Sequence, residues 1–304
     1  MSLLQSKKAP IFIIIIVIII LILLFFFTYV KKAKIRLETY NDILSSFNTS
    51  YGKMSYIDQG SGETILVFHG LFGGYDQGYD SVKNFADDYR IIAPSRFGYP
   101  GTDLPENSTV KDQAKAYLEL IDSLGIDKVY VLGTSAGGSC ATRFALEYPD
   151  RVKGIILYCS NASPIQKPAP SEIIDYAAVP KFFCNDFMMW VSGPIMKSMM
   201  NMSSETWLSI FPVSERKDGI VNDGYNANRD FEINYDEYTL EKMKTPVIAL
   251  HAKDDNMADY DRVANMIKRF PNGKLISFET GGHMLQGNDK EVENAVKQFI
   301  NNTK

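Results

Sequence analysis

The sequence predicts an α/β fold: a doubly wound, mostly parallel sheet with a helical cap insertion, preceded by an N-terminal transmembrane helix. Three observations support this prediction. An uncharged apolar stretch lies near the start of the chain, short apolar runs of strand length then alternate with segments of helical periodicity, and one long interval interrupts the alternation. A chain of 304 residues has room for one large domain after the apolar stretch is subtracted.

Residues 11–30 read IFIIIIVIIILILLFFFTYV, which as a helix is long enough to cross the hydrocarbon layer of a membrane. A cleaved signal peptide is the alternative. Its apolar part is shorter, however, and ends in a small-residue cleavage site, whereas Lys31 and Lys32 follow here. We therefore expect an uncleaved single-pass anchor over residues 1–33. Basic residues lie on both sides of the span, so the side of the membrane that holds the rest of the chain stays open.

After the anchor we expect a polar juxtamembrane connector with a short helix over residues 34–50, and a single domain over residues 51–304. The strand-like runs of this domain are continuously apolar, which is typical of parallel strands covered by helices on both faces. Segments with helical spacing of apolar residues separate them, for example 114–124 and 263–270. The expected strands are residues 53–58, 64–68, 90–94, 128–133, 153–159, 246–251 and 274–278.

Residues from about 162 to 242 lack a strand pattern and are rich in helix formers, so we expect them to fold as a helical cap inserted between two strands. Methionine and aromatic residues are unusually dense there. Two interpretations stay open, namely core packing within the cap and an adaptable lining for an apolar substrate. The residues are Phe182, Phe183, Phe187, Met188, Met189, Trp190, Met196, Met199, Met200, Met202 and Trp207.

Charge and cysteine content narrow the range of partners. The net charge of -4 gives no electrostatic reason to expect nucleic-acid binding. The cysteines Cys140, Cys159 and Cys184 are odd in number and have no C-x-x-C spacing, so neither a disulfide framework nor a zinc site is predicted. We expect buried free thiols.

A candidate nucleophile lies directly after the strand-like run KVYVLG. The segment Gly133-Thr134-Ser135-Ala136-Gly137 has the form G-x-S-x-G and is followed by a helical run, which is the arrangement of a nucleophile elbow. The glycines have a physical cause, because a sharp strand-to-helix turn strains the serine backbone and leaves no room for side chains two residues away. Ser135 is therefore the predicted nucleophile.

A serine hydroxyl needs a general base within hydrogen-bond reach. His283 follows Gly281 and Gly282 just past the last expected strand, on a loop that can reach the same sheet edge as the nucleophile. We assign His283 as the base. The acid that orients it normally lies between nucleophile and histidine along the chain, and Asp254 and Asp255 at the end of a strand are both candidates.

Negative charge that develops on the substrate oxygen needs backbone N–H donors. The segment His69-Gly70-Leu71-Phe72-Gly73-Gly74 follows the run TILVF and resembles a His-Gly oxyanion loop. The donors would be the backbone N–H groups of Leu71 and of Ala136, the residue after the nucleophile. His69 itself is expected to brace this loop rather than to titrate in catalysis.

Over about residues 51–303 these motifs, with Ser95-Arg96-Phe97-Gly98-Tyr99, resemble the α/β-hydrolase superfamily. The resemblance implies a Ser-His-Asp triad that acts through an acyl-enzyme, with no metal and no organic cofactor. It also favours Asp255 as the acid, since this residue matches the G-x-x-D pattern of the family with Ala252 in place of glycine. Two departures are Ser95, where many relatives have aspartate, and Thr134-Ser135-Ala136 in place of the His-Ser-Met of many lipases.

The predicted function is hydrolysis of a carboxylic ester or related acyl compound, with a small-molecule or lipid-like substrate, by a membrane-anchored serine hydrolase. A carbon–carbon bond hydrolase and a proline-type aminopeptidase are alternatives on the same fold, as is a binding scaffold without catalysis. Serine at position 135 argues against haloalkane dehalogenases and epoxide hydrolases, whose members carry aspartate there. The substrate and the oligomeric state stay open.

Overall fold

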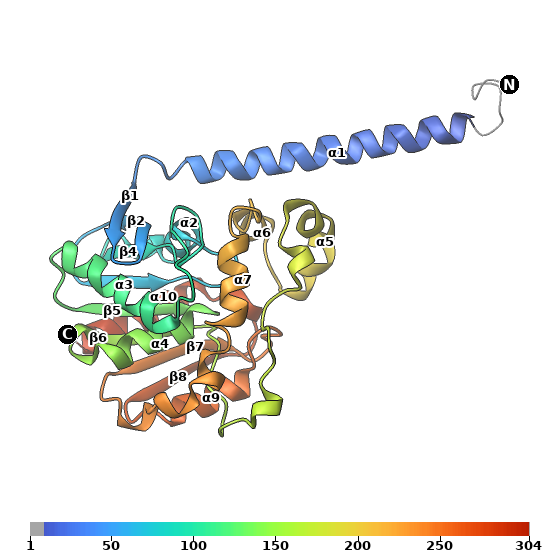
Figure 1. Ribbon diagram of the computed structural model, residues 1–304. Coiled ribbons are helices and arrows are strands. Elements are labelled where there is room, and N and C mark those ends of the chain that lie inside the picture. The colour runs from blue at the N-terminus through green and yellow to red at the C-terminus, as the bar shows by residue number, and fades with distance from the viewer. Residues whose placement is uncertain (1–8, 304) are drawn as a thin grey trace.

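The computed structural model describes residues 9–303 and contains one eight-stranded sheet, in the order β1-β2-β4-β3-β5-β6-β7-β8 (Figure 1). The first two strands pair antiparallel to their neighbours, and β3 to β8 are parallel. This confirms the expected doubly wound, mostly parallel sheet. The strands are β1 (Leu44–Thr49), β2 (Gly52–Gln59), β3 (Thr64–Phe68), β4 (Arg90–Pro94), β5 (Val129–Thr134), β6 (Val152–Tyr158), β7 (Val247–Ala252) and β8 (Gly273–Phe278).

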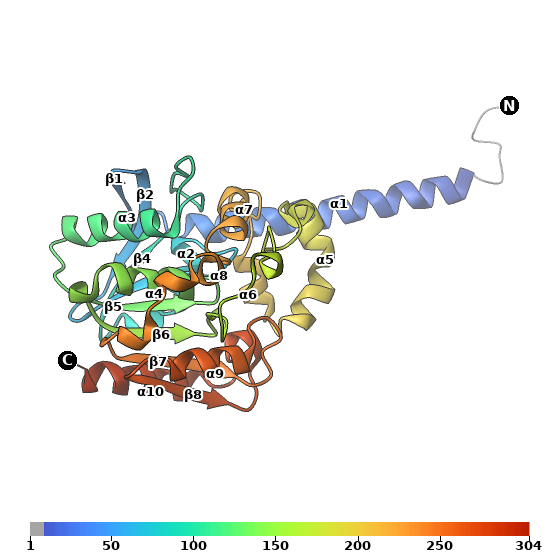
Figure 2. The same cartoon turned by 60° about the horizontal axis from the view of Figure 1, so that its bottom comes forward.

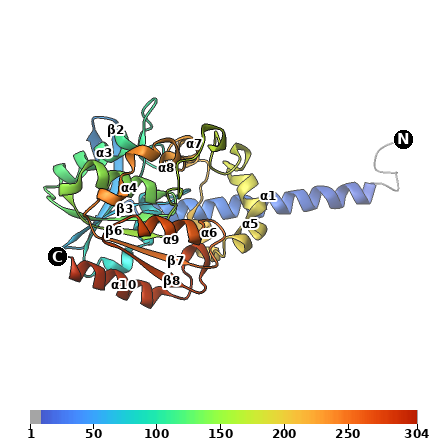
Figure 3. The same ribbon diagram turned by 90° about the horizontal axis from the view of Figure 1, so that it is seen from below.

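Helices cover both faces of the sheet (Figures 2 and 3). One face packs against α3 (Val110–Ser123), α4 (Gly137–Glu147) and α9 (Tyr260–Lys268), and the other against α2 (Tyr75–Asp80) and α10 (Asp289–Asn302). Successive strand residues such as those of β3 belong to the two cores in turn, and every residue of that strand is buried. Burial on both faces explains why the strands have continuous apolar sequences.

The cap follows β6 and precedes β7, as expected, and lies at the carboxyl ends of the parallel strands (Figures 1 and 2). Its helices are α5 (Asp186–Met199), α6 (Ser204–Ser209), α7 (Lys217–Tyr225) and α8 (Asp230–Ile233), joined by loops and short 3-10 turns. Asn185 and Ser203 cap α5 and α6, since the side chain of each accepts a backbone N–H of the first helical turn.

The structure differs from the expected connector over residues 34–50, in which only a short helix was expected. The first helix, α1 (Ala9–Glu38), continues beyond residue 33 without a break, and residues 44–49 form the antiparallel edge strand β1. The helix continues because its last turns pack on the domain: Ala33 is fully buried and Arg36 forms an ion pair with Asp76. The strand was missed because its sequence LSSFNT is mostly polar and is held by backbone pairing with β2.

Among residues 9–303, α1 is the one helix long and apolar enough to cross a membrane, over Pro10–Glu38. Its N-terminal part projects past the cap (Figure 1), and its apolar side chains are exposed on all sides. From Phe26 onward one stripe of the helix faces the domain, where Phe26 contacts Phe187 and Trp190 and Tyr29 contacts Phe211.

Candidate active site

Ser135 lies at a tight turn between β5 and α4, with a positive φ of 52°. A side chain at Gly137 would place its Cβ 2.0 Å from the carbonyl oxygen of Phe68. At Gly133 the added Cβ would come within 2.8 Å of the Cα of Gly138. The two outer glycines of the G-x-S-x-G segment are therefore required by close backbone approach, and the turn presents the serine hydroxyl at the carboxyl edge of the sheet.

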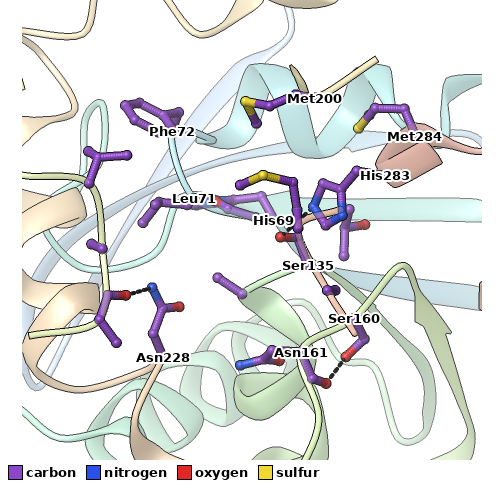
Figure 4. A pocket seen from close by; sticks show the side chains of 18 of the residues that line it. His69, Leu71, Phe72, Ser135, Ser160, Asn161, Met200, Asn228, His283 and Met284 are labelled. Carbon is purple, nitrogen blue, oxygen red and sulfur yellow. Dashed lines mark hydrogen bonds between the residues drawn. The ribbon is translucent and has the colours of Figure 1, made fainter. Parts of the chain in front are cut away.

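Three distant segments meet at this hydroxyl. The Nε2 of His283 lies 2.8 Å from the Oγ of Ser135 (Figure 4), and its Nδ1 lies 2.9 Å from the nearer carboxylate oxygen of Asp255. Asp254, the other candidate acid, accepts the backbone N–H of Gly282 at 2.8 Å instead. The structure thus brings together Ser135, His283 and Asp255, and it places Asp254 where it holds the Gly-Gly-His loop.

The carboxylate of Asp255 accepts several hydrogen bonds. Its Oδ1 accepts the backbone N–H groups of Met257 at 2.8 Å and Ala258 at 3.0 Å. Burial raises the pKa of Asp255, but hydrogen bonds from His251, His283 and Ala258 outweigh burial and hold the pKa well below its usual range. An ionised Asp255 fixes the proton of His283 on Nδ1, so that Nε2 is free to accept the serine proton.

His251 was given no role from the sequence. It is fully buried at the end of β7, and its Nε2 lies 2.9 Å from the carbonyl oxygen of Ala258 and 3.2 Å from Oδ2 of Asp255. A proton on Nε2 serves both acceptors. The ring therefore ties the Asp255 carboxylate to the loop that follows it, which is a positioning contact on the acid of the site.

Leu71 and Ala136, the predicted oxyanion donors, lie on the two segments that flank Ser135. A side chain at Gly70 would place its Cβ 3.2 Å from the Cβ of Ser135, so the loop runs close beside the serine. Within residues 9–303, neither the Leu71 nor the Ala136 N–H donates a hydrogen bond to another protein group. Both N–H groups are therefore available as the donors that the sequence predicts.

His69 holds this loop in place, as the sequence suggests. Its Nδ1 bonds the carbonyl oxygen of Gly70 at 2.8 Å, and its Nε2 accepts the backbone N–H of Arg96 at 2.9 Å. Burial, reinforced by the nearby Arg96 charge, lowers the pKa of His69 well below its usual range. A neutral ring with one donor and one acceptor matches both contacts.

A buried ion pair from the cap also reaches the loop. Arg96 bonds Asp223 of α7 at 2.7 Å, and a second guanidinium nitrogen donates to the carbonyl oxygen of Gly70 at 3.2 Å. Tyr99 donates to the same carboxylate at 2.5 Å. Ser95, at the position where many relatives have aspartate, accepts the backbone N–H of Tyr75. The sequence offered one indirect signal, since a missing aspartate beside a buried arginine requires a carboxylate from elsewhere.

A second buried pair joins the loop to α1. Arg216 of the cap donates to the carbonyl oxygen of Gly73 and pairs with Asp76 at 2.9 Å. The same carboxylate accepts Arg36 of α1 at 2.8 Å. Two arginines and an imidazole thus bind the Gly70 and Gly73 carbonyl oxygens of the loop that carries Leu71.

A cavity of about 700 Å³ lies between the cap and the sheet edge and contains Ser135 and His283. The volume suits a small-molecule ligand. Figure 4 shows Met200 and Met284 beside His283. Of the aromatic and methionine residues singled out in the cap, Met189, Met196, Met200, Met202 and Trp207 line the cavity, whereas Phe182, Phe187, Met188 and Met199 are exposed.

Within residues 9–303, one group of side chains is close enough to share a metal ion: Cys159, His251 and Asp255. Burial raises the pKa of the Cys159 thiol far above neutrality, so the sulfur keeps its proton. The carboxylate of Asp255 and the Nε2 of His251 already bond to protein groups. This donor set does not fit a metal ion.

Comparison with known proteins agrees with the fold. The sequence matches the family model described as "alpha/beta hydrolase fold" over residues 63–290. It is 26% identical over 249 residues to 2-hydroxy-6-oxo-6-phenylhexa-2,4-dienoate hydrolase of Burkholderia cepacia, covering 75% of this chain and 84% of that protein.

Solved structures show the same architecture. A thermophilic esterase from Thermogutta terrifontis superposes with a TM-score of 0.70 at 19% identity, covering 86% of this chain and 98% of the esterase. A meta-cleavage product hydrolase from Pseudomonas fluorescens superposes with a TM-score of 0.66 at 17% identity, covering 86% and 98% of the two chains.

Proposed function

This chain belongs to the alpha/beta hydrolase fold family, and from that premise we propose that it is a membrane-anchored serine hydrolase that cleaves a carboxylic ester or related acyl substrate. One observation carries the proposal. The hydroxyl of Ser135, the imidazole of His283 and the carboxylate of Asp255 form a continuous hydrogen-bonded series with links of 2.8 and 2.9 Å. Such a series makes a serine nucleophilic at neutral pH.

The reaction follows from these contacts. Ser135 attacks the substrate carbonyl while Nε2 of His283 takes its proton, and the N–H groups of Leu71 and Ala136 stabilise the oxyanion. The protonated imidazole then gives its proton to the leaving alcohol, and an acyl-enzyme remains. Water, deprotonated by the same nitrogen, attacks the acyl carbonyl. The bond to Oγ of Ser135 then breaks as the imidazolium returns the proton to Oγ, and the acid is released. Each oxyanion donor is worth about 10²- to 10³-fold in rate.

The cavity favours a neutral, apolar acyl group. Arg262 is the one Lys or Arg side chain among the residues that line it, and Glu232 pairs with it at 2.7 Å. A dienoate substrate of the kind named for the Burkholderia relative carries a carboxylate, which needs a free cation in a buried site. The apolar lining therefore supports an ester over carbon–carbon bond cleavage, which remains the second candidate.

Packing at the end of α1 supports an anchor that stays attached over a cleaved signal sequence. Ala33 is fully buried, and Arg36 pairs with the buried Asp76. Cleavage after the apolar stretch near Val30 would leave this docked helical turn at the new N-terminus, without the preceding turns of α1. We propose that α1 spans the bilayer and that the domain begins where the helix docks on it.

Labelling with a fluorophosphonate probe tests the nucleophile. The wild-type chain should be labelled, Ser135→Ala should lose the label, and Ser81→Ala should keep it. Ser81 is a matched control because it also lines the cavity, but its hydroxyl donates to the carbonyl of Gly78. Label that persists in Ser135→Ala would show that the proposed nucleophile is wrong.

A series of p-nitrophenyl esters of increasing acyl length tests the substrate. We expect kcat/KM to rise from acetate toward medium-length chains as methylene groups fill the methionine-lined cavity. Faster turnover of 2-hydroxy-6-oxo-6-phenylhexa-2,4-dienoate than of every ester would favour the carbon–carbon bond hydrolase instead.

A further inference from the structure

Helix α5 of the cap is apolar on two opposite faces. Its inner face, with Met189, Met196 and the following Met200, lines the cavity. On its outer face Val191 is 51% exposed and Ile195 67% exposed. Exposed apolar side chains gathered on one helix face mark a contact surface for a membrane or another protein. The outer face of α5 is defined here as Phe187, Met188, Val191, Ile195 and Met199.

Contacts with α1 place this outer face at a definite level along the apolar span. The ring of Phe26 lies 5.3 Å from that of Phe187 and 5.7 Å from that of Trp190, measured between centroids. Phe26 is near the C-terminal end of the apolar stretch 11–30. Figures 1 and 2 show α5 beside this part of α1. If α1 spans a bilayer, α5 lies where the hydrocarbon gives way to the headgroups.

Further contacts fix α1 against the domain. Tyr29 packs on Phe211 with the ring centroids 5.1 Å apart, and Arg36 pairs with Asp76 below the cap. Because α1 is docked at several points, it is not joined to the domain by a loose linker, and its insertion sets the height of the cap. Lys31 and Lys32 of α1 are exposed just beyond this level, where headgroup phosphates would lie.

We propose that the outer face of α5 is a membrane-contact surface that dips into the interfacial layer of the bilayer spanned by α1. This inference rests on the membrane anchoring and the hydrolase activity proposed above. The two faces of α5 then have related uses: the outer face enters the lipid, and the inner face lines the cavity over Ser135. The substrate is an amphiphile with an ester bond, taken from the bilayer rather than from water.

Site-directed spin labelling of the full chain in phosphatidylcholine vesicles tests this placement. The native cysteines Cys140, Cys159 and Cys184 are buried, so a nitroxide reacts with an introduced surface cysteine. The test variant is Ile195→Cys. The matched control is Ile233→Cys, which is 47% exposed on α8, a helix held to α4 by the Arg143 to Asp230 contact. The readout is the ratio of collisions with oxygen, which is concentrated in lipid, to collisions with a water-soluble nickel chelate.

We expect the ratio at position 195 to be severalfold higher than at position 233. An equal ratio at the two positions would overturn the proposal, and so would protection of position 195 from both reagents, because that result indicates a second copy or a protein partner on α5. The variant Ile18→Cys reports on the span itself. Water exposure there would refute the anchor, while hydrolysis of soluble p-nitrophenyl butyrate reports independently on the hydrolase.

A functional test uses Ile195→Lys with Ile233→Lys as control. We expect Ile195→Lys to lose activity severalfold on a long-chain ester embedded in the vesicles, with activity on p-nitrophenyl butyrate unchanged. The control should be unaffected on both substrates. Equal loss on both substrates would point to a damaged cap and contradict a role in membrane contact.

Discussion

Removing the carboxylate of Asp223 should destabilise the protein more than any surface substitution. Arg96 and Asp223 have side chains only 2% and 4% exposed and form two contacts of 2.7 Å. Breaking a buried pair by removing one partner costs about 3–5 kcal/mol, since the other charge is left without compensation in a dry site. In Asp223→Ala this charge is the guanidinium of Arg96, and Tyr99 loses its acceptor as well.

For a domain of this size, 1 kcal/mol lowers the Tm by about 2–4 °C, so the expected decrease is about 6–20 °C. Thermal unfolding of the full chain in detergent, followed by circular dichroism, measures it. The control is Asp236→Ala, because the carboxylate of Asp236 pairs with Lys167 but is 70% exposed. This substitution should change the free energy of unfolding by no more than about 1 kcal/mol.

The double variant Arg96→Met with Asp223→Leu separates charge burial from lost packing. Replacing a buried pair by apolar side chains is often neutral, so most of the lost Tm should return. Catalytic activity should not return, because the Gly70 carbonyl has lost its guanidinium donor. If the Tm of Asp223→Ala lies within about 2 °C of the wild-type Tm, the loss of stability is no more than about 1 kcal/mol, and the reasoning is refuted.

Three further predictions concern the acid of the site and the oxyanion loop. Asp255→Asn should lower kcat about 10⁴-fold by favouring the wrong tautomer of His283, whereas Asp254→Asn, which touches only the loop amides, should lose much less; kcat of the two variants compared side by side decides which residue is the acid. His251→Ala should lower kcat about 10- to 100-fold with little change in KM, because it displaces a carboxylate without touching the cavity, and a change confined to KM would contradict this role. Burial keeps His69 neutral in the folded chain, so below about pH 6.5 the unfolded chain binds a proton that the folded chain does not bind. The free energy of unfolding should then fall by up to about 1.4 kcal/mol for each pH unit below this value. Unfolding measured at pH 5 and pH 7 should show a smaller fall in His69→Gln.

The parallel strands could be predicted because burial on both faces requires apolar residues at every position. Both faces of β3 and β5 are buried, so every position is apolar or small, and the bounds agree with those expected to within one residue. β1 could not be found in this way. It is an edge strand with a half-exposed, polar sequence, and its structure comes from pairing with β2.

In the candidate site, too, local sequence identified some residues, while others are brought in only by the fold. Ser135 and His283 lie in short glycine-bearing motifs next to strand ends, so local sequence identified them. Asp223 lies 127 positions from Arg96 and reaches it only because the cap folds back over the sheet edge. His251 reads as an ordinary buried strand residue, and its contact with Asp255 depends on a turn that no residue type specifies.

The continuous docking of α1 has a practical consequence for preparing a water-soluble form. A chain cut at residue 39 would lose Ala33 and Arg36, uncover Phe211 and leave Asp76 with a single cation. A chain that begins near residue 25 would lack most of the apolar stretch but keep the turns of α1 that pack on the domain. The need for detergent and the intactness of the domain therefore change at different start points, about fourteen residues or four helical turns apart.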